Sequence, residues 1–234
     1  ILAKDGSRMS KSKGNGVDPM QLIETYGADA MRFNLLTLVT GTQDVRFDAE
    51  KLEDGTFESP RTEAARGFVT KIWNASRFVQ MNLEGFTPGA PEIRTSADAW
   101  MFSHLAKLVR SVTSGIEEYR FGDVAHDLYE FFWNEFCDWY IELSRVSLKG
   151  APDERLAAQR NLVFVLDNAL RLLHPAMPFV TEAIWEKMPH AGDAPALIVA
   201  QWPEASDFAQ WIDEDAERSV SLLCAVVGAV RSTR

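Results

Sequence analysis

The amino-acid sequence predicts a mainly α-helical protein in which a short α/β region precedes a helical bundle. After residue 60, apolar residues recur mostly at the three- and four-residue spacing of amphipathic helices. Alternating apolar and polar residues, the pattern of a half-buried strand, mark residues 44–48. The chain has 234 residues, 46% of them apolar, which is enough for a substantial core and for one or two domains.

Local signals define the elements of the first 48 residues. Asp18 is suited to cap a helix, Pro19 favours the first helical position, and Gly27 can end that helix. An Asp5-Gly6 pair indicates a turn after a strand end. The predicted elements are a strand end at residues 1–3, helices at residues 19–26 and 28–40, and a strand at residues 44–48.

The rest of the chain predicts a bundle of amphipathic helices. Prolines and glycines in residues 84–96 separate its first two helices, and His174-Pro175 ends a later one. The predicted elements are helices at residues 61–82, 97–119, 123–148, 152–173 and 178–187, an extended link at residues 197–202, and a last helix from residue 220. The apolar stripe of the 123–148 helix exceeds half its circumference, so we expect this helix at the centre.

The charge distribution limits the possible functions. With 24 Lys and Arg against 34 Asp and Glu, the formal net charge is −10, so binding to a polyanion requires a local basic patch. Residues 1–16 and 61–77 are the expected places for such a contact. Neither a membrane-spanning run nor a secretory signal is predicted. Cys137 and Cys224 lie in apolar helical patterns, so we expect core residues rather than a disulfide or a metal site.

The most informative segment is Arg8-Met9-Ser10-Lys11-Ser12-Lys13-Gly14-Asn15. Its cations and hydroxyl groups suit phosphate, and a predicted helix N-terminus follows at Asp18. The chain has no Walker loop and no G-x-G-x-x-G motif after a strand. By composition alone, a solvated basic turn without a ligand is the more common outcome. The order of the residues is what favours a ligand.

That order resembles the K-M-S-K-S signature of class I aminoacyl-tRNA synthetases. The resemblance continues through Asp18-Pro19 and residues 26–32 (Tyr-Gly-Ala-Asp-Ala-Met-Arg), in the stem-contact region of that family. The valyl branch of the family is the most similar. The segments that carry this similarity are residues 43–47, 71–79 and 174–185. The resemblance covers the whole chain.

Three features depart from the family pattern. Arg8 stands where the family usually has Lys, which preserves the charge but changes the donor geometry. Residues 54–60 resemble an extra loop. None of the four histidines, His104, His126, His174 and His190, lies in an H-I-G-H element. We therefore expect a fragment without the nucleotide-binding half, the inserted editing domain and the C-terminal arm.

The resemblance implies activation of valine by ATP with magnesium and transfer of the aminoacyl group to tRNA. It assigns Lys11 as the catalytic residue, which stabilises the charge on the departing pyrophosphate. The residues implied in ATP binding are Arg8, Ser10, Lys11 and Ser12, with Met9 as a hydrophobic anchor. No metal ligands are implied. The implied division is a K-M-S-K-S loop and stem-contact region at 1–48, an anticodon-binding helical bundle at 49–219, and the start of a truncated C-terminal connection at 220–234.

The expected partners are ATP, a valine-accepting tRNA, and the missing catalytic and editing domains of a monomeric, cytoplasmic enzyme. Arg66, Asn74 and Arg77 share an exposed face of the 61–82 helix and are the candidate tRNA contacts, although an ordinary solvated face fits equally well. Aromatic residues such as Phe132 and Phe136 have core spacing. Two alternatives stay open: an isoleucyl or leucyl enzyme fragment, and a non-catalytic helical module that binds tRNA or another partner.

Overall fold

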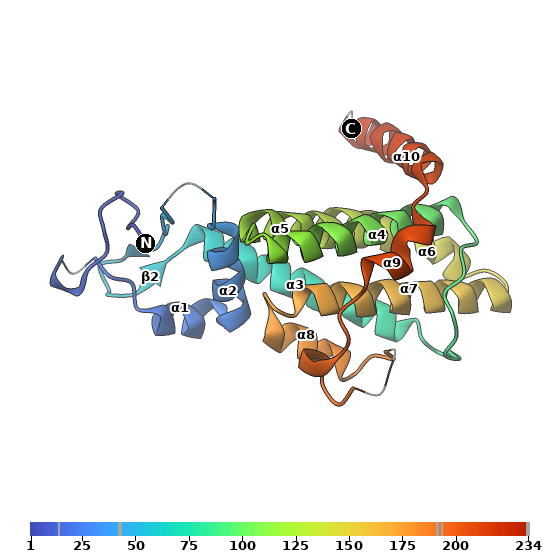
Figure 1. Cartoon of the computed structure of the whole chain (residues 1–234), viewed down its shortest axis with the longest axis horizontal. Coiled ribbons are helices and arrows are strands. Elements are labelled where there is room, and N and C mark those ends of the chain that lie inside the picture. The colour runs from blue at the N-terminus through green and yellow to red at the C-terminus, as the bar shows by residue number, and fades with distance from the viewer. Residues whose placement is uncertain (14, 42–43, 191, 193, 233–234) are drawn as a thin grey trace.

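The computed structural model confirms a mainly helical fold with a small N-terminal region attached to one end of a helical bundle (Figure 1). It describes residues 1–13, 15–41, 44–190, 192 and 194–232, with only the backbone of Lys11 and Ser232. Gly14 and Gln43, which belong to two of the family-like segments, lie outside the described residues. Within the described part, no helix combines the length and apolar character that a bilayer span requires.

Two short helices and a hairpin make up most of the N-terminal region. Its elements are η1 (Lys11–Lys13), α1 (Pro19–Tyr26), α2 (Ala28–Thr37), β1 (Glu50–Lys51) and β2 (Phe57–Glu58), the strands pairing antiparallel with Glu50 opposite Glu58. Asp18 caps α1 as predicted, its carboxylate accepting from the Met20 N–H at 2.9 Å. Gly27 adopts φ +90° between α1 and α2, a conformation that favours glycine.

Three expectations for this region were wrong. The predicted strand at residues 44–48 is reduced to one parallel bridge, between Arg46 and Leu2. The supposed extra loop at residues 54–60 contains the turn and second strand of the hairpin, together with the first residue of the next helix. The helix predicted to reach residue 40 ends at Thr37, because the following backbone packs against the start of α5 (Phe121–Tyr129), where a Cβ on Gly122 would lie 2.2 Å from the Val39 oxygen.

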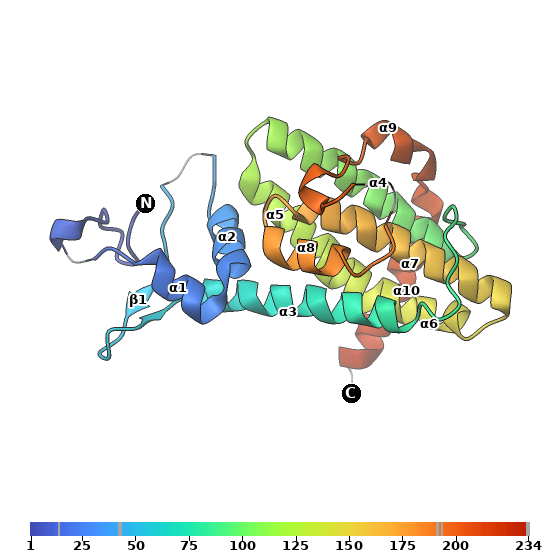
Figure 2. The same cartoon turned by 90° about the horizontal axis from the view of Figure 1, so that it is seen from below.

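The bundle consists of long helices packed around one large core (Figure 2). Its main elements are α3 (Pro60–Met81), α4 (Ser96–Glu117), α5 (Phe121–Tyr129), η2 (Glu130–Tyr140), α6 (Ile141–Leu148), α7 (Pro152–Leu173) and α8 (Pro178–Trp185). The largest fully buried side chains include Trp185, Tyr140, Phe68, Phe102, Phe132 and Phe136. The helix predicted at 61–82 is confirmed with Phe68, Ile72 and Val79 buried.

The predicted 123–148 helix is continuous but not uniformly α-helical. Its middle segment, η2, is a π-helix, in which each hydrogen bond spans one more residue than in an α-helix. The wider turn shifts the buried face. Tyr140 and Leu148 are buried, whereas Trp139 and Leu143, which the 3.6-residue period places in the stripe, are half-buried.

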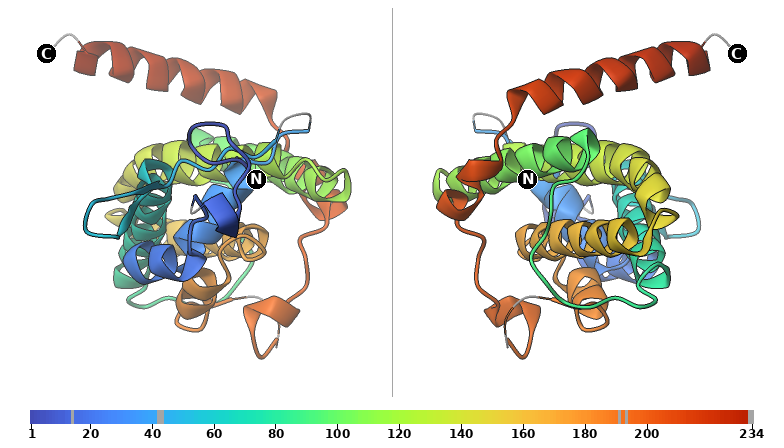
Figure 3. Two further views of the ribbon diagram at one scale, coloured as in Figure 1. Left: turned by 90° about the vertical axis from the view of Figure 1, so that its left-hand side faces the viewer. Right: turned by 90° about the vertical axis from the view of Figure 1, so that its right-hand side faces the viewer.

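The C-terminal part is more helical than predicted. The supposed extended link begins with the 3₁₀ helix η3 (Leu197–Val199), and α9 (Ala205–Phe208) and η4 (Ala209–Trp211) follow. The last helix, α10 (Glu214–Ser232), begins six residues before Val220. It packs on α4 and crosses one side of the bundle (Figure 3): Ala216 and Val220 are buried, Cys224 packs against the same core, and the Arg231 guanidinium lies 5.4 Å from the Trp139 ring centroid.

Candidate functional site

The basic segment at residues 7–15 forms a loop held by the side chain of Asn15. The Asn15 Oδ1 accepts from the Ser10 N–H at 2.9 Å, and Nδ2 donates to the Ser7 Oγ at 2.9 Å and to the Arg8 carbonyl at 3.3 Å. One amide therefore joins both ends of the loop. Sequence analysis placed Asn15 in the basic segment but assigned it no role. The signal that could have indicated a role was its position just after the basic residues.

The loop brings together two of the polar groups that were predicted as phosphate ligands. The Ser10 and Ser12 hydroxyl oxygens lie 3.3 Å apart, and the backbone of Lys11 lies between them in η1. Arg8 and Lys13 are exposed, and neither makes an ion pair with another described residue. By contrast, Lys4 is paired with Glu50. The exposed cations are thus available to an anionic ligand.

The base of the loop is fixed to the small apolar cluster of the N-terminal region. Met9 is half-buried and packs against a cluster whose buried members are Leu22, Met31, Leu38, Phe47 and Ala49. Leu2 forms bridges with both Arg8 and Arg46, so the start of the chain is part of the same support. The Arg46 guanidinium lies against Gly6, where a Cβ would be 2.9 Å from Nη2. The polar tip of the loop is therefore exposed to solvent, whereas the base of the loop is packed against the N-terminal region.

The three candidate tRNA contacts lie on α3. Arg66, Asn74 and Arg77 are all exposed, and Arg66 lies 3.8 Å from Glu63. Arg77 makes no ion pair with another described residue. Near this face, Lys187 Nζ lies 5.6 Å from the Trp73 ring centroid, a distance compatible with a cation–π contact. The structure thus confirms the shared exposure of these side chains, and the role in tRNA binding stays a prediction.

The aromatic side chains of the central helix are mainly structural. Phe132 and Phe136 are buried as predicted. Trp133 stacks on Tyr129 at a centroid distance of 5.3 Å, and Lys71 Nζ lies 3.9 Å from the Trp133 ring centroid. Lys71 also binds the Asp138 carboxylate at 2.6 Å. This cation is therefore already neutralised within the bundle.

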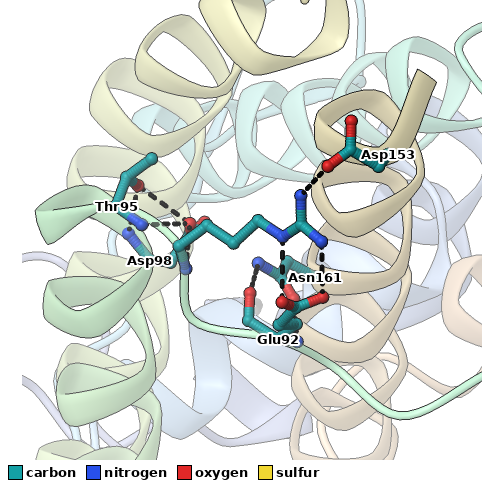
Figure 4. Close-up of polar contacts among 6 residues, drawn as sticks. Glu92, Thr95, Asp98, Asp153 and Asn161 are labelled. Atoms are coloured by element: carbon teal, nitrogen blue, oxygen red, sulfur yellow. Dashed lines mark hydrogen bonds and ion pairs between the residues drawn. The ribbon is translucent and has the colours of Figure 1, made fainter. Parts of the chain in front are cut away.

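A cavity of about 560 Å³ lies at the end of the bundle, between α4, α6 and α7. Its lining includes Asp98, Asp153 and Glu154. The Arg94 guanidinium, which also lines it, binds Asp153 at 2.7 Å and Glu92 at 3.0 Å (Figure 4). Because its one arginine is committed to carboxylates, this cavity is unsuited to a phosphate.

The two cysteines and the described acidic residues are the remaining candidates for redox or metal chemistry. Burial raises the pKa of Cys137 to about 12, so its reactive thiolate form is disfavoured. Cys137 and Cys224 are both free thiols. Among the described residues, no group of three or more His, Cys, Asp or Glu side chains could hold a metal ion.

Two family models match this chain. The model described as the anticodon-binding domain of tRNA ligase matches residues 98–234, and the model for class I tRNA synthetases (I, L, M and V) matches residues 1–48. The first model covers more than half of the chain, which therefore belongs to the family of the anticodon-binding domain of tRNA ligase.

Curated relatives refine this assignment. The chain is 45% identical over 239 residues to the valine--tRNA ligase of Lactobacillus johnsonii, 43% over 233 residues to that of Geobacillus kaustophilus, and 46% over 240 residues to that of Lactiplantibacillus plantarum. These alignments cover 100%, 98% and 100% of this chain, and 26%, 25% and 25% of the relatives. The chain thus spans about a quarter of the length of these relatives. The predicted similarity to the valyl branch is confirmed.

Solved structures share the fold at low sequence identity. The Agrobacterium radiobacter K84 agnB2 LeuRS–tRNA–LeuAMS complex matches with a TM-score of 0.64 and 20% identity, covering 91% of this chain and 24% of that one. Mycobacterium tuberculosis methionyl-tRNA synthetase in complex with methionyl-adenylate matches with a TM-score of 0.59 and 22% identity, covering 79% of this chain and 36% of that one. At these identities the likeness concerns the fold alone.

Proposed function

We propose that this chain is part of a valine--tRNA ligase, which activates valine with ATP and transfers it to tRNA. The observation that carries the proposal is the identity of 41–46% to valine--tRNA ligases along the whole chain. This identity includes both the exposed basic loop and the helical bundle. It favours valine over isoleucine or leucine.

In this proposal, the loop at residues 7–15 acts on the triphosphate of ATP. Formation of the aminoacyl-adenylate breaks the bond between the α- and β-phosphates, and negative charge develops on the departing pyrophosphate. An ammonium group from Lys11, with donors from Arg8, Ser10 and Ser12, stabilises this charge more in the transition state than in the bound substrate. Magnesium accompanies the nucleotide, and no residue of this chain is assigned to it.

The bundle binds the tRNA in this proposal. We assign residues 1–48 to the loop and stem-contact region, residues 49–219 to the anticodon-binding bundle, and residues 220–234 to the start of a C-terminal connection. Arg66, Asn74 and Arg77 on α3 are the proposed RNA contacts. The complete enzyme is proposed to be a cytoplasmic monomer that contains further catalytic and editing domains.

Amino-acid-dependent exchange of pyrophosphate into ATP tests the activity. The complete ligase containing this chain is expected to exchange pyrophosphate with valine, and far more slowly with isoleucine or leucine. The chain alone is expected to show no aminoacylation. Efficient exchange with isoleucine or leucine instead of valine would reassign the substrate. Tight tRNA binding by a complete protein that shows no exchange would favour the non-catalytic module.

Titration with tRNA tests the role of the bundle. Binding of valine-accepting tRNA to the chain alone is expected to be weak and to decrease with salt, because the acidic surface can neutralise few phosphates. A tRNA with an altered anticodon is the matched control, measured at two salt concentrations. Equal affinity for both tRNAs would contradict anticodon recognition by this bundle.

A further inference from the structure

Helix α2 attaches the N-terminal region to the bundle in three main places: at α3, at the turn between α7 and α8, and at α5. The first is α3, which follows it closely in sequence: Phe33 and Phe68 have ring centroids 5.0 Å apart, and the Asn34 amide donates to the Thr62 hydroxyl at 2.8 Å. The second is the turn between α7 and α8, far along the chain (Figure 2). One contact patch alone permits rotation about it. Separated attachments together fix the orientation.

At the second attachment, Asp29 caps α8. Pro178, the first residue of α8, has no N–H, and the N-cap residue Met177 supplies no side-chain acceptor. The Asp29 carboxylate accepts from the next two backbone groups, the Phe179 N–H at 3.1 Å and the Val180 N–H at 2.6 Å. Asp29 is only 7% exposed. A residue 150 positions away thus takes the role of a local N-cap.

Arg32 completes this contact from the same face of α2, three residues further on. Its Nη2 donates to the Pro175 carbonyl at 2.8 Å, and its Nε donates to the Ala176 carbonyl at 3.3 Å. A carboxylate therefore meets the N–H groups of the α7–α8 turn, and a guanidinium meets its carbonyl groups. Exchanging the two charges would oppose both interactions, so the contact specifies one orientation.

The turn that receives these two side chains is itself rigid. Thr181, fully buried, donates its hydroxyl to the Met177 carbonyl at 2.7 Å, and its oxygen lies 2.8 Å from Nδ1 of His174. Because the hydroxyl hydrogen is already used, this arrangement favours Nδ1–H as the donor to Thr181. Burial also lowers the pKa of His174, which favours the neutral ring.

The same helix α2 supports the candidate catalytic loop. Met31, between Asp29 and Arg32 in sequence, belongs to the apolar cluster against which Met9 packs. A continuous series of contacts therefore runs from the loop through Met9 and Met31 to α2, and from Asp29 and Arg32 to the bundle. These contacts hold the base of the loop and the bundle helices in one relative position.

We propose that Asp29 and Arg32 are positioning residues that align the catalytic loop with tRNA bound to the bundle. This inference rests on the proposed ligase function. A tRNA held by the bundle must place its acceptor end at the adenylate, and a misplacement of about 1 Å can cost roughly 10²-fold in rate. Adenylate formation does not involve the tRNA, so it does not depend on this alignment.

The test compares two activities of the complete ligase. In Asp29→Ala and Arg32→Ala, valine-dependent pyrophosphate exchange without tRNA is expected to stay within about twofold of wild type, whereas kcat/KM for tRNA in aminoacylation falls about 10- to 100-fold. Asp29→Asn retains one carbonyl acceptor and is expected to be intermediate. Glu24→Ala, an exposed carboxylate on α1, is the matched control and is expected to change neither activity.

The outcomes separate alignment from a merely structural role. Equal losses of exchange and aminoacylation in Asp29→Asn and Arg32→Ala, accompanied by a lower thermal unfolding midpoint, would contradict the proposal. Unchanged aminoacylation in an active ligase would also contradict it. A wild-type ligase without valine-dependent exchange would contradict the proposed function, and this inference with it.

Discussion

The N-terminal region and the helical bundle are stabilised in different ways. In the N-terminal region the buried apolar side chains form a small separate cluster of Leu22, Met31, Leu38, Phe47 and Ala49. The loop at residues 7–15 is held mainly by hydrogen bonds from Asn15. The bundle has one continuous core with large aromatic side chains that are almost completely buried.

This difference corresponds to the two proposed roles. A segment with few buried apolar contacts opens locally at low free-energy cost, as a loop that acts on a departing group requires. A densely packed core resists deformation and presents its surface side chains in fixed positions. We therefore expect substitutions in the bundle to affect global stability, and substitutions in the loop to affect chemistry or local opening.

The largest expected effect is on the stability of the core. Phe68 is fully buried and lies near the rings of Phe33, Tyr129 and Phe132. Phe68→Ala is expected to lower the free energy of unfolding by about 3–5 kcal/mol. Met9→Ala, which truncates a half-buried side chain of the loop, is expected to cost about 1 kcal/mol. Urea unfolding of both variants measures the difference, and equal losses would refute the contrast between the regions.

The next effect concerns catalysis. Lys11→Ala in the complete ligase is expected to lower valine-dependent pyrophosphate exchange by about 10²-fold, comparable to the loss of one preorganised donor. Unfolding and tRNA affinity are expected to stay unchanged. Lys51→Ala, which removes an exposed lysine from β1, is the matched control. An unchanged kcat in Lys11→Ala would remove this residue from the mechanism.

A smaller effect is expected on the local stability of the loop. Asn15→Ala removes the acceptor of the Ser10 N–H and two further hydrogen bonds. If these are worth about 1–2 kcal/mol together, amide hydrogen exchange at Ser10 accelerates by roughly tenfold while the global unfolding midpoint is unchanged. Asn15→Asp retains the acceptor and is expected to restore part of the protection. A matching fall in the global midpoint would show that the loop unfolds only with the bundle.

The smallest effect concerns tRNA binding by α3. Arg77→Ala is expected to weaken tRNA binding about two- to fivefold and to reduce the slope of log K against log salt by about 1. Arg218→Ala is the matched control, because this exposed arginine is paired with Asp215. Titrations at several salt concentrations measure both quantities. Equal changes in the two variants would indicate a general charge effect rather than a contact at Arg77.

Much of the fold follows from local sequence signals. The proline at the start of α1, α7 and α8 and the apolar periodicity of α3 and α4 predicted these helices to within a few residues. The π-helical segment was not predictable in this way, because its hydrogen-bond pattern depends on packing around Phe132, Phe136 and Tyr140 rather than on a local preference. The short strands were also missed, since two-residue pairings have almost no periodicity.

The candidate site was predictable in composition but not in geometry. Arg8, Ser10 and Ser12 lie so near one another in the sequence that the chain itself keeps them in the same loop. The exposure of Arg66, Asn74 and Arg77 follows from helical periodicity. The contacts of Asp29 and Arg32 could be identified only from the folded chain, because neither residue has a partner nearby in the sequence that indicates its role.

The sequence by itself determined the helical class of this protein, the residue composition of its basic loop and its similarity to class I tRNA synthetases. These properties depend on residue order over short distances, where backbone geometry fixes which side chains are neighbours. Only the tertiary structure decided the π-helical shift of the central helix, the hydrogen bonds of Asn15 and the capping of α8 by Asp29. The capping of α8 arises because burial forces polar groups that are distant in the sequence to pair, and the amino-acid order does not specify such partners locally.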